Sequence, residues 1–360
     1  MLELIALDDC SLHSRAAHLR KSPSHTIISL RLFMEPLFLT TVARFLKPIL
    51  LALLAYGGLA MFSVAAQTLP VGSMTPQRVS GSAWYVQGGL ALGSPANRNF
   101  ISNAGFVITR SGVVVIDALG SPQLARELLA QIARLTPLPV THVIVTHYHA
   151  DHIYGLQEFR KAGAKIIAHQ AAREYLTSAT AAARLTASRV DLAPWVDGKT
   201  QLVAADEWLD GPRELVIGGV RFVLQPVGPA HTPEDLMIYL PDEKVVFAGD
   251  IVARGRVPFI GQADSRHWLA SLNAILALNP TVIVPGHGPV STSPREDLDL
   301  TRDYLVYLRD TMGVAARELE PFEDAYARAD WSRFERLPLF RAANRMNAYN
   351  TYLLLEMETK

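Results

Sequence analysis

The sequence predicts a layered domain of the α/β or α+β class, built on two β-sheets, and three observations support this. Short runs rich in Val and Ile alternate with helical patterns from Trp84 onward. Strand patterns are dense on both sides of the middle of the chain. Each half also contains a strand ending in aspartate, a helix and a strand delivering histidine (VVVIDA then VIVTH, and VVFAGD then VIVPGH). Chance similarity among Val-rich strands is the alternative; a meaningful parallel would bring equivalent strand ends of the two sheets to one site.

The first half contains a strand, a helix and two further strands. The run 112–120 (GVVVIDALG) is a buried strand that ends at Asp117. A helix follows, because Ser121 can cap its N-terminus and Pro122 suits its first position, with apolar residues at helical spacing up to Leu135. The next two strands are expected at 141–152, which runs into a polar loop, and at 165–169.

The second half is predicted to contain two hairpins, a helix and one more strand. Residues 214–228 form two strands about the Gly218 and Gly219 turn, and residues 236–250 form two more about Pro241 and Asp242. After them we expect a helix over 265–278, a strand over 281–288 and a helical tail. We divide the chain into an N-terminal extension (1–66), a catalytic domain (67–295) and this tail (296–360).

The N-terminal extension has the layout of an export signal. Residues 48–66 carry no charge and follow Arg44 and Lys47, and small residues allow cleavage just before Gln67 or one residue earlier. We therefore expect a periplasmic or secreted protein. The alternative is a retained membrane anchor, because the uncharged run approaches the roughly 20 residues that span a bilayer. Charged residues in 1–33 are unusual ahead of such a signal, so Met34 competes with Met1 as the start.

Composition narrows the choice of partners. The chain has 34 Lys and Arg and 34 Asp and Glu, so no overall charge attracts nucleic acid, and a small-molecule substrate is expected instead. The single cysteine, Cys10, lies in the N-terminal extension, so the exported form would have neither a disulfide nor a cysteine metal ligand. Membrane association is expected only through an uncleaved anchor, and no pattern specifies an oligomeric state.

Four potential metal ligands stand together at the end of the 141–152 strand: His147, His149, Asp151 and His152. A polar loop is the alternative, but three histidines and an aspartate within six residues are unusually dense. If the segment stays extended, alternation places His147, His149 and Asp151 on one side, with His152 directed to a second ion. Imidazole and carboxylate groups are the usual ligands of catalytic zinc.

Three further candidates occupy similar positions at strand ends. His231 lies in GPAHTPED, Asp250 in FAGD and His287 in VPGHGP, and glycine or proline beside each histidine allows a close approach of backbone. Seven ligand-type residues at four strand ends indicate a metal site.

This set resembles the metallo-β-lactamase superfamily. The superfamily motif HxHxDH stands at residues 147–152, the later motifs match at His231, Asp250 and His287, and Asp117 matches an early strand-end aspartate. The resemblance spans about 89–291. It implies an αββα sandwich, an α+β fold with two mixed sheets packed face to face, helices outside and metal ions at one edge.

The resemblance also implies a role for each ligand and two Zn²⁺ ions, with Fe or Mn as possible replacements. The first ion would be held by His147, His149 and His231, the second by Asp151, His152 and His287, and both by Asp250 as a bridge. A hydroxide between the ions would be the nucleophile. Asp151 would act as the catalytic residue that orients this hydroxide or carries its proton, while Asp117 would support the ligand loop.

The resemblance leaves three functions open. The first is hydrolysis of a small ester, thioester or lactone, because an aspartate at the bridging position is similar to glyoxalase II, lactonase, sulfatase and phosphodiesterase branches. The second is β-lactam hydrolysis, because the histidine after Asp151 also occurs in one β-lactamase subclass. The third is a metal-binding accessory role in a redox system. The stretches NAGFVIT, YHADHIYGL and 231–272 are similar to exported zinc metallohydrolases of the quinoprotein-relay type, related to those near sulfur-oxidation systems.

Several other residues are candidates for the pocket wall. Arginines there could hold a substrate carboxylate or phosphate, and ordinary solvated charge is the alternative. The candidates are Arg254, Arg256, Pro258, Phe259, Arg341, Asn344, Arg345 and Tyr349. We expect Tyr148 and Tyr154 to pack in the core, His142 and His267 to be structural, and His169 to be either structural or an outer partner of the site.

Overall fold

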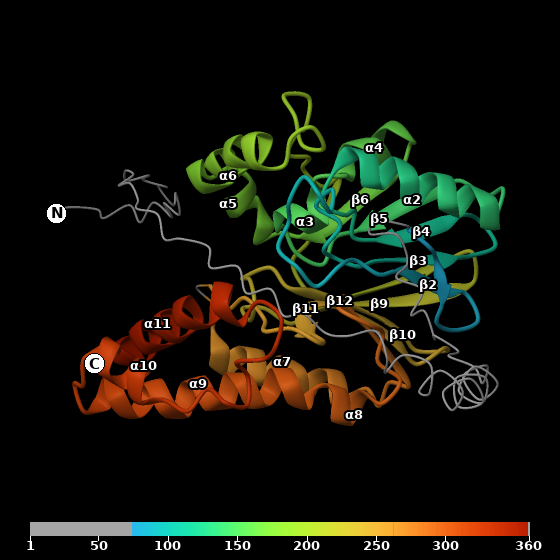
Figure 1. Cartoon of the computed structure of the whole chain (residues 1–360). Coiled ribbons are helices and arrows are strands. Elements are labelled where there is room, and N and C mark those ends of the chain that lie inside the picture. The colour runs from blue at the N-terminus through green and yellow to red at the C-terminus, as the bar shows by residue number, and fades with distance from the viewer. Residues whose placement is uncertain (1–73, 262, 359–360) are drawn as a thin grey trace, which may run out of the picture. The chain divides into compact units, whose positions relative to one another are not determined.

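The chain forms two β-sheets that pack face to face, with helices covering both outer faces (Figure 1). The structure is a computed structural model that describes residues 74–261 and 263–358. The predicted αββα sandwich with two mixed sheets is confirmed. The predicted export signal or anchor, together with Cys10 and Met34, lies outside the described residues. Within them, no helix combines the length and the apolar composition needed to cross a membrane.

The first sheet contains seven strands in chain order. Its first four strands pair antiparallel and its last four pair parallel. The strands are β1 (Gln77–Arg78), β2 (Ala83–Val86), β3 (Ala104–Ile108), β4 (Val113–Ile116), β5 (Val140–Ile144), β6 (Lys165–His169) and β7 (Glu207–Leu209).

The second sheet contains five strands in the order β12-β11-β10-β9-β8. Only β11 and β12 pair parallel. The two predicted hairpins supply the antiparallel pairs β8–β9 and β10–β11, and β9 pairs antiparallel with β10 where the hairpins meet. The strands are β8 (Arg213–Ile217), β9 (Val220–Pro226), β10 (Leu236–Leu240), β11 (Val245–Ala253) and β12 (Val282–His287).

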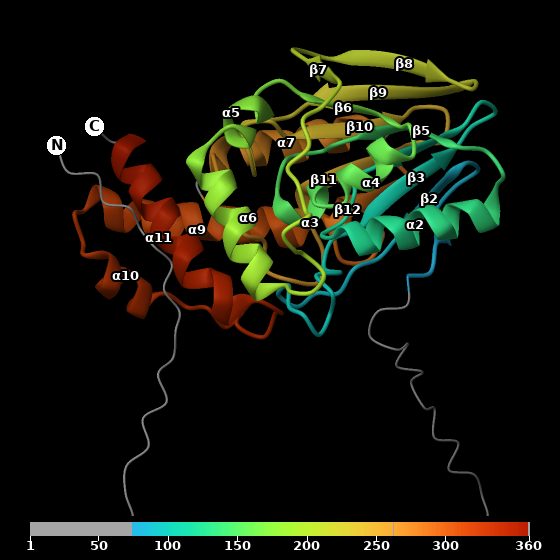
Figure 2. The same cartoon turned by 90° about the horizontal axis from the view of Figure 1, so that it is seen from above.

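The helices form the two outer layers, and Figure 2 shows α9, α10 and α11 grouped at one side of the sheets. The layer on the first sheet contains α2 (Pro122–Leu135), α3 (Ala150–Ile153), α4 (Leu156–Lys161), α5 (Ala172–Leu176) and α6 (Ala179–Asp191). The layer on the second sheet contains α7 (Ser265–Ala277), α8 (Pro294–Asp297), α9 (Asp299–Arg317), α10 (Phe322–Arg328) and α11 (Phe340–Glu358). Helix α2 begins as predicted, because the Ser121 hydroxyl accepts a hydrogen bond from the Leu124 amide.

Three hydrophobic clusters fill the spaces between the four layers. The side chains of strand β4 belong to two of these clusters. Val113 and Val115 pack in the cluster under α2, while Val114 and Ile116 pack in the cluster between the sheets. Both faces of β4 are therefore buried, which explains why its sequence is a continuous apolar run instead of an alternating one.

The same supersecondary unit occurs once in each sheet. In the first, β4, α2 and β5 form a parallel strand–helix–strand unit, and in the second, β11, α7 and β12 do the same. Asp117 and His147 follow the ends of β4 and β5, while Asp250 lies in β11 and His287 ends β12. The parallel between the two halves of the sequence therefore corresponds to a parallel in the structure, and it brings equivalent strand ends to one edge.

The C-terminal helices share a hydrophobic cluster with the second sheet. Tyr304 and Leu308 of α9 and Ala348 of α11 belong to the same cluster as Val246 and Ala248 of β11. The tail therefore extends the outer layer that α7 begins, and it lies against the strand that carries Asp250.

Candidate metal centre

All seven predicted ligands come together at the edge where the two sheets meet. They form two groups, and within each group one ligand atom per residue lies within 4.8 Å of every other. The first group is His147, His149, His231 and Asp250, and the second is Asp151, His152 and His287.

The loop after β5 supplies four of these side chains through a change of backbone conformation. His149 is extended, with φ −77° and ψ 150°, and α3 begins at the next residue. The prediction that strand alternation places Asp151 beside His147 and His149 is therefore wrong. A helical turn directs Asp151 and His152 to the other group, where the Asp151 carboxylate lies 3.3 Å from Nε2 of His287.

Two glycines allow Asp250 to reach the centre. Gly249 adopts a left-handed conformation, with φ +52°, at an irregularity in the pairing of β11 with β12. Gly286 of β12 lies directly against Asp250, and a Cβ atom there would be 2.0 Å from the Asp250 Oδ1 atom. These positions explain the glycines in the FAGD and PGH motifs, because side chains at either would strain the backbone or displace the carboxylate.

The Asp250 carboxylate lies between the two groups. Its Oδ2 atom is 3.5 Å from Nε2 of His231 and 3.1 Å from Nε2 of His287, and its Oδ1 atom is 3.3 Å from Nε2 of His152. Ligands placed 2.0–2.1 Å from a tetrahedral zinc ion are separated by about 3.3 Å. The Asp250 oxygens and histidine nitrogens thus already have the spacing that ligands of a small cation require.

Unpaired polar atoms also fit the residues to a cation. Nε2 of His147, Nε2 of His152 and Oδ1 of Asp250 are buried and have no hydrogen-bond partner among the described residues. Burying such atoms without a partner costs free energy, so native sites normally satisfy them. Nδ1 of His149 and Nε2 of His231 face each other at 2.9 Å. A divalent cation would satisfy these nitrogen and oxygen atoms together.

Hydrogen bonds behind the ligands fix their orientation. The Asp117 carboxylate accepts hydrogen bonds from the Thr146 amide and hydroxyl, each at 2.8 Å, and lies 2.9 Å from Nδ1 of His152. Nδ1 of His147 contacts the Thr146 hydroxyl at 3.0 Å, and Nδ1 of His287 donates to the Ile101 carbonyl at 2.7 Å. Such partners set the ring orientation of metal-binding histidines. The structure thus gives Asp117 the supporting place that the sequence predicts.

Two supporting residues are not predicted from the sequence. Asp235 accepts hydrogen bonds from the amide and hydroxyl of Thr232 and so fixes the turn that carries His231. Asn103 donates to the carbonyls of Pro285 and Gly288 and holds the loop on either side of His287. The signal for Asp235 is its position in the same HTPED motif, whereas Asn103 acts across 182 residues of sequence and gives no local signal.

Burial and charge set the protonation of the two groups differently. Burial holds the pKa of His147 well below its usual value and lowers that of His149 to about 3, with His152 and His231 respectively adding to the effect. Burial also opposes protonation of His152, but the carboxylates of Asp151, Asp250 and Asp117 outweigh it and raise the His152 pKa. The pKa of Asp250 stays low despite burial, because His287 and His152 lie beside it. The first group therefore contains neutral imidazoles, the form that binds metal.

The other candidates divide into core, surface and site residues. Tyr148 and Tyr154 are buried in the core, as predicted, and Asn344 is buried among the tail helices, where it bonds to Tyr304. Arg254 donates to the carbonyls of Pro289 and Val290, and Arg345 pairs with Glu323 on the surface. These contacts hold the side chains of Asn344, Arg254 and Arg345. Arg256 is buried, and the negative charges of Asp250 and Asp151 act on its guanidinium.

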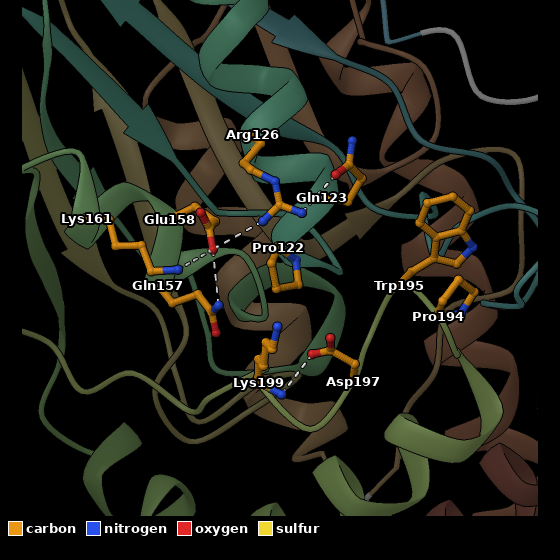
Figure 3. A pocket seen from close by; sticks show the side chains of 10 residues that line it. All are labelled: Pro122, Gln123, Arg126, Gln157, Glu158, Lys161, Pro194, Trp195, Asp197 and Lys199. Atoms are coloured by element: carbon orange, nitrogen blue, oxygen red, sulfur yellow. Dashed lines mark hydrogen bonds and ion pairs between the residues drawn. The ribbon is translucent and has the colours of Figure 1, made fainter.

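Two other histidines and a cleft are not part of the two ligand groups. His267 is exposed and pairs with Asp264, the N-cap of α7, as a structural role predicts, and His169 has a buried Nδ1 atom without a partner among the described residues. A cleft of about 470 Å³ beside α2 and α4 is shown in Figure 3. None of the seven ligands lines it, and its Glu158 is already paired with Arg126 and Lys161.

The fold and the site together define a class of metal-binding proteins: two sheets in a sandwich, with a buried histidine and aspartate cluster at their common edge that could hold metal ions. The chain belongs to the metallo-beta-lactamase superfamily, whose sequence pattern matches residues 97–287.

Individual relatives agree with this membership. The chain is 24% identical over 234 residues to a linear primary-alkylsulfatase from Pseudomonas sp. (strain ATCC 19151), a match covering 55% of this chain and 44% of that protein. It is 25% identical over 195 residues to metallo-beta-lactamase IND-1 from Chryseobacterium indologenes, covering 53% and 73% of the two chains. The chain thus spans less than half of the alkylsulfatase and about three quarters of the lactamase.

Solved structures show the same fold. The stereoselective inverting sec-alkylsulfatase Pisa1 from Pseudomonas sp. aligns with a TM-score of 0.62 at 20% identity, covering 78% of this chain and 50% of that one.

Proposed function

We propose that the chain is a hydrolase that holds two zinc-class ions and cleaves a small ester, thioester or lactone. The position of Asp250 carries this proposal. Its two oxygens face histidines of both groups, at 3.5 Å from His231 and at 3.1–3.3 Å from His287 and His152. A carboxylate placed in this way can bind two cations at once.

Each side chain then has a defined task. His147, His149 and His231 would hold the first ion, Asp151, His152 and His287 the second, and Asp250 both. When bound, two divalent ions lower the pKa of a water molecule between them and polarise a substrate carbonyl.

Asp151 is our candidate catalytic residue. One of its oxygens, Oδ2, faces His287 and His152, and its side chain is 18% exposed, more than that of Asp250 or His287. We propose that the second oxygen, Oδ1, accepts a proton from the attacking water. His152 is fully buried and held by Asp117, so it orients the centre and stays away from the substrate.

A substrate panel with metal removal tests the proposal. Purified protein is assayed on an aryl ester, a thioester, a lactone and an alkyl sulfate, before and after exhaustive chelation and after zinc is restored. We expect turnover of at least one carbonyl substrate that disappears with the metal and returns with zinc. Full activity after verified loss of metal would refute the proposal.

β-Lactam hydrolysis is the second candidate, and the similarity to IND-1 over 73% of that protein favours it. The lack of any cysteine after Cys10 disfavours it, because the superfamily members with cysteine at the position of Asp250 are the zinc β-lactamases. A chromogenic cephalosporin in the same panel separates the two functions. Bound metal without turnover on any substrate would instead support a metal-binding accessory role in a redox system.

We further propose that the protein acts outside the cytoplasm. The uncharged run 48–66 after two cations supports this, since it has the composition of an export signal.

A further inference from the structure

Arg256 is a buried cation for which the described residues provide no ion-pair partner. Its side chain is 3% exposed, and its Nε atom is buried and has no hydrogen-bond partner among the described residues. No carboxylate of these residues lies within 4.0 Å of the Arg256 guanidinium, the distance that defines an ion pair. Arginine is almost never fully buried unless it is paired, because losing water costs the charged group several kcal/mol. Its burial therefore calls for a partner that the described residues do not supply.

The surroundings of Arg256 place it beside the metal centre. It follows Asp250 by six residues and the end of β11 by three. Burial lowers the pKa of the guanidinium, and the charges of Asp250 and Asp151 oppose this effect. The charge of Arg256 in turn opposes protonation of His287. Ala253 pairs with His287, and the Arg254 amide donates to the His287 carbonyl at 3.0 Å, so Arg256 lies on a loop that begins beside the second ligand group.

The C-terminal helices hold the loop that carries Arg256. The Val257 amide donates to the Pro338 carbonyl at 3.0 Å. The buried Asn347 side chain of α11 donates to the Pro258 carbonyl at 2.7 Å and accepts from the Ile260 amide at 2.9 Å. These bonds fix the backbone directly after Arg256. The loop that carries Arg256 is therefore fixed by the C-terminal helices.

Other cations of the chain, in contrast to Arg256, have partners. Arg254, two residues earlier, has its guanidinium occupied by Pro289, Val290 and Asp297. Arg126 and Lys161, in the cleft of Figure 3, are both paired with Glu158. Arg256 differs from these three cations, because none of the described residues pairs with it.

We propose that Arg256 binds an anionic group of the substrate, a carboxylate, sulfate or phosphate, beside the second ligand group. The planar guanidinium presents two parallel N–H donors that match such a group. The net charge of the centre also favours an anionic substrate group. Two divalent ions carry four positive charges and Asp151 and Asp250 remove two, so with Arg256 the centre attracts an anion. The inference rests on the proposed hydrolase function and narrows its substrate to an anionic compound.

Phosphate binding tests Arg256 independently of turnover. Inorganic phosphate is titrated calorimetrically into zinc-loaded wild type, Arg256→Gln, Arg256→Lys and Arg345→Gln, at equal metal content. Arg345→Gln is the matched control, because it removes one cation from the surface, where Arg345 pairs with Glu323. We expect Arg256→Gln to weaken phosphate binding about 10-fold to 100-fold, as for a lost charge-assisted hydrogen bond. Arg256→Lys should lie between it and wild type, and Arg345→Gln should match wild type.

A pair of substrates then tests specificity. For 4-acetoxybenzoate, Arg256→Gln should lower kcat/KM by the same factor as it lowers phosphate affinity, whereas for the uncharged 4-acetoxybenzamide it should change kcat/KM less than about twofold. Equal phosphate affinity in wild type and Arg256→Gln would show that the ions alone bind anions and would overturn the inference. If Arg256→Gln loses its metal, Arg256→Lys replaces it, and an unchanged affinity there overturns the inference as well. Absence of all hydrolysis with intact phosphate discrimination would count against the hydrolase function and leave Arg256 as an anion-binding residue.

Discussion

Replacing Asp250 with alanine should weaken both metal sites at once. The carboxylate is 3.1 Å from His287, 3.3 Å from His152 and 3.5 Å from His231, so its removal takes a ligand from each group. It also leaves two cations without the negative charge that separates them. His231→Ala removes a ligand from the first group alone and should leave the second ion bound.

The magnitude follows from what Asp250 contacts. Changes to residues that only orient metal ligands typically cost 10-fold to 100-fold in affinity or activity. A direct ligand of both ions should cost at least this factor at each site, about 1.4–2.7 kcal/mol per ion or more. If Asp250 served only as a structural hydrogen-bonding group in β11, alanine would cost about 1 kcal/mol of folding stability and leave metal binding unchanged.

Metal content and thermal unfolding, measured on the same sample, separate these outcomes. We expect wild type to hold about two ions, Asp250→Ala one or none, and His231→Ala about one. His267→Ala is the matched control, because His267 is an exposed histidine at the start of α7, and it should retain both ions. A folded Asp250→Ala protein that keeps two ions with wild-type affinity would refute the bridging assignment.

Three further predictions concern residues that do not bind the ions themselves. Asp117→Asn should reduce metal affinity about 10-fold to 100-fold in a chelator competition, because it removes a charge that orients His152; unchanged affinity would contradict this. Glu243 has a lowered pKa: burial raises it, but hydrogen bonds from Ser80 and Ser82 outweigh burial. The Glu243 carboxylate thus stabilises the folded protein above the unfolded-state pKa of about 4.3, and this stabilisation is lost as the pH falls further. Glu243→Gln should therefore lower the free energy of unfolding by about 0.5–1 kcal/mol at pH 7 and by almost nothing near pH 3, as measured by chemical unfolding. N-terminal sequencing of exported protein should begin at Gln67 or one residue earlier, and recovery of an intact Met1 or Met34 terminus would count against cleavage.

Local patterns predicted the ligands and the strands that carry them. The apolar run of β4 and the histidine-rich end of β5 are both visible in the sequence, because a strand buried on two faces must be apolar and a metal site needs particular side chains. The conformation after His149 was harder to predict, because helix α3 is only four residues long. A turn of this length has no apolar periodicity, so strand alternation alone places Asp151 on the side of His147 and His149, whereas the family resemblance places it with His152 and His287, as the structure does.

Tertiary packing determines which arginines are buried and which are exposed, and local sequence patterns do not show this. Arg254, Arg256 and Arg345 look alike as isolated charges, yet only Arg256 is buried beside the centre. This difference depends on α11, whose Asn347 holds the loop from a position 87 residues away in the sequence. Helix α6 was also hard to predict, because only three of its 13 residues are buried and it lacks a clear apolar stripe.

Anomalous diffraction from crystals of the zinc-loaded protein tests the central claim most directly. The account predicts two zinc peaks at the edge of the sandwich, one among His147, His149 and His231 and the other among Asp151, His152 and His287, with the Asp250 carboxylate between them. A single peak, or zinc bound away from Asp250, would contradict it.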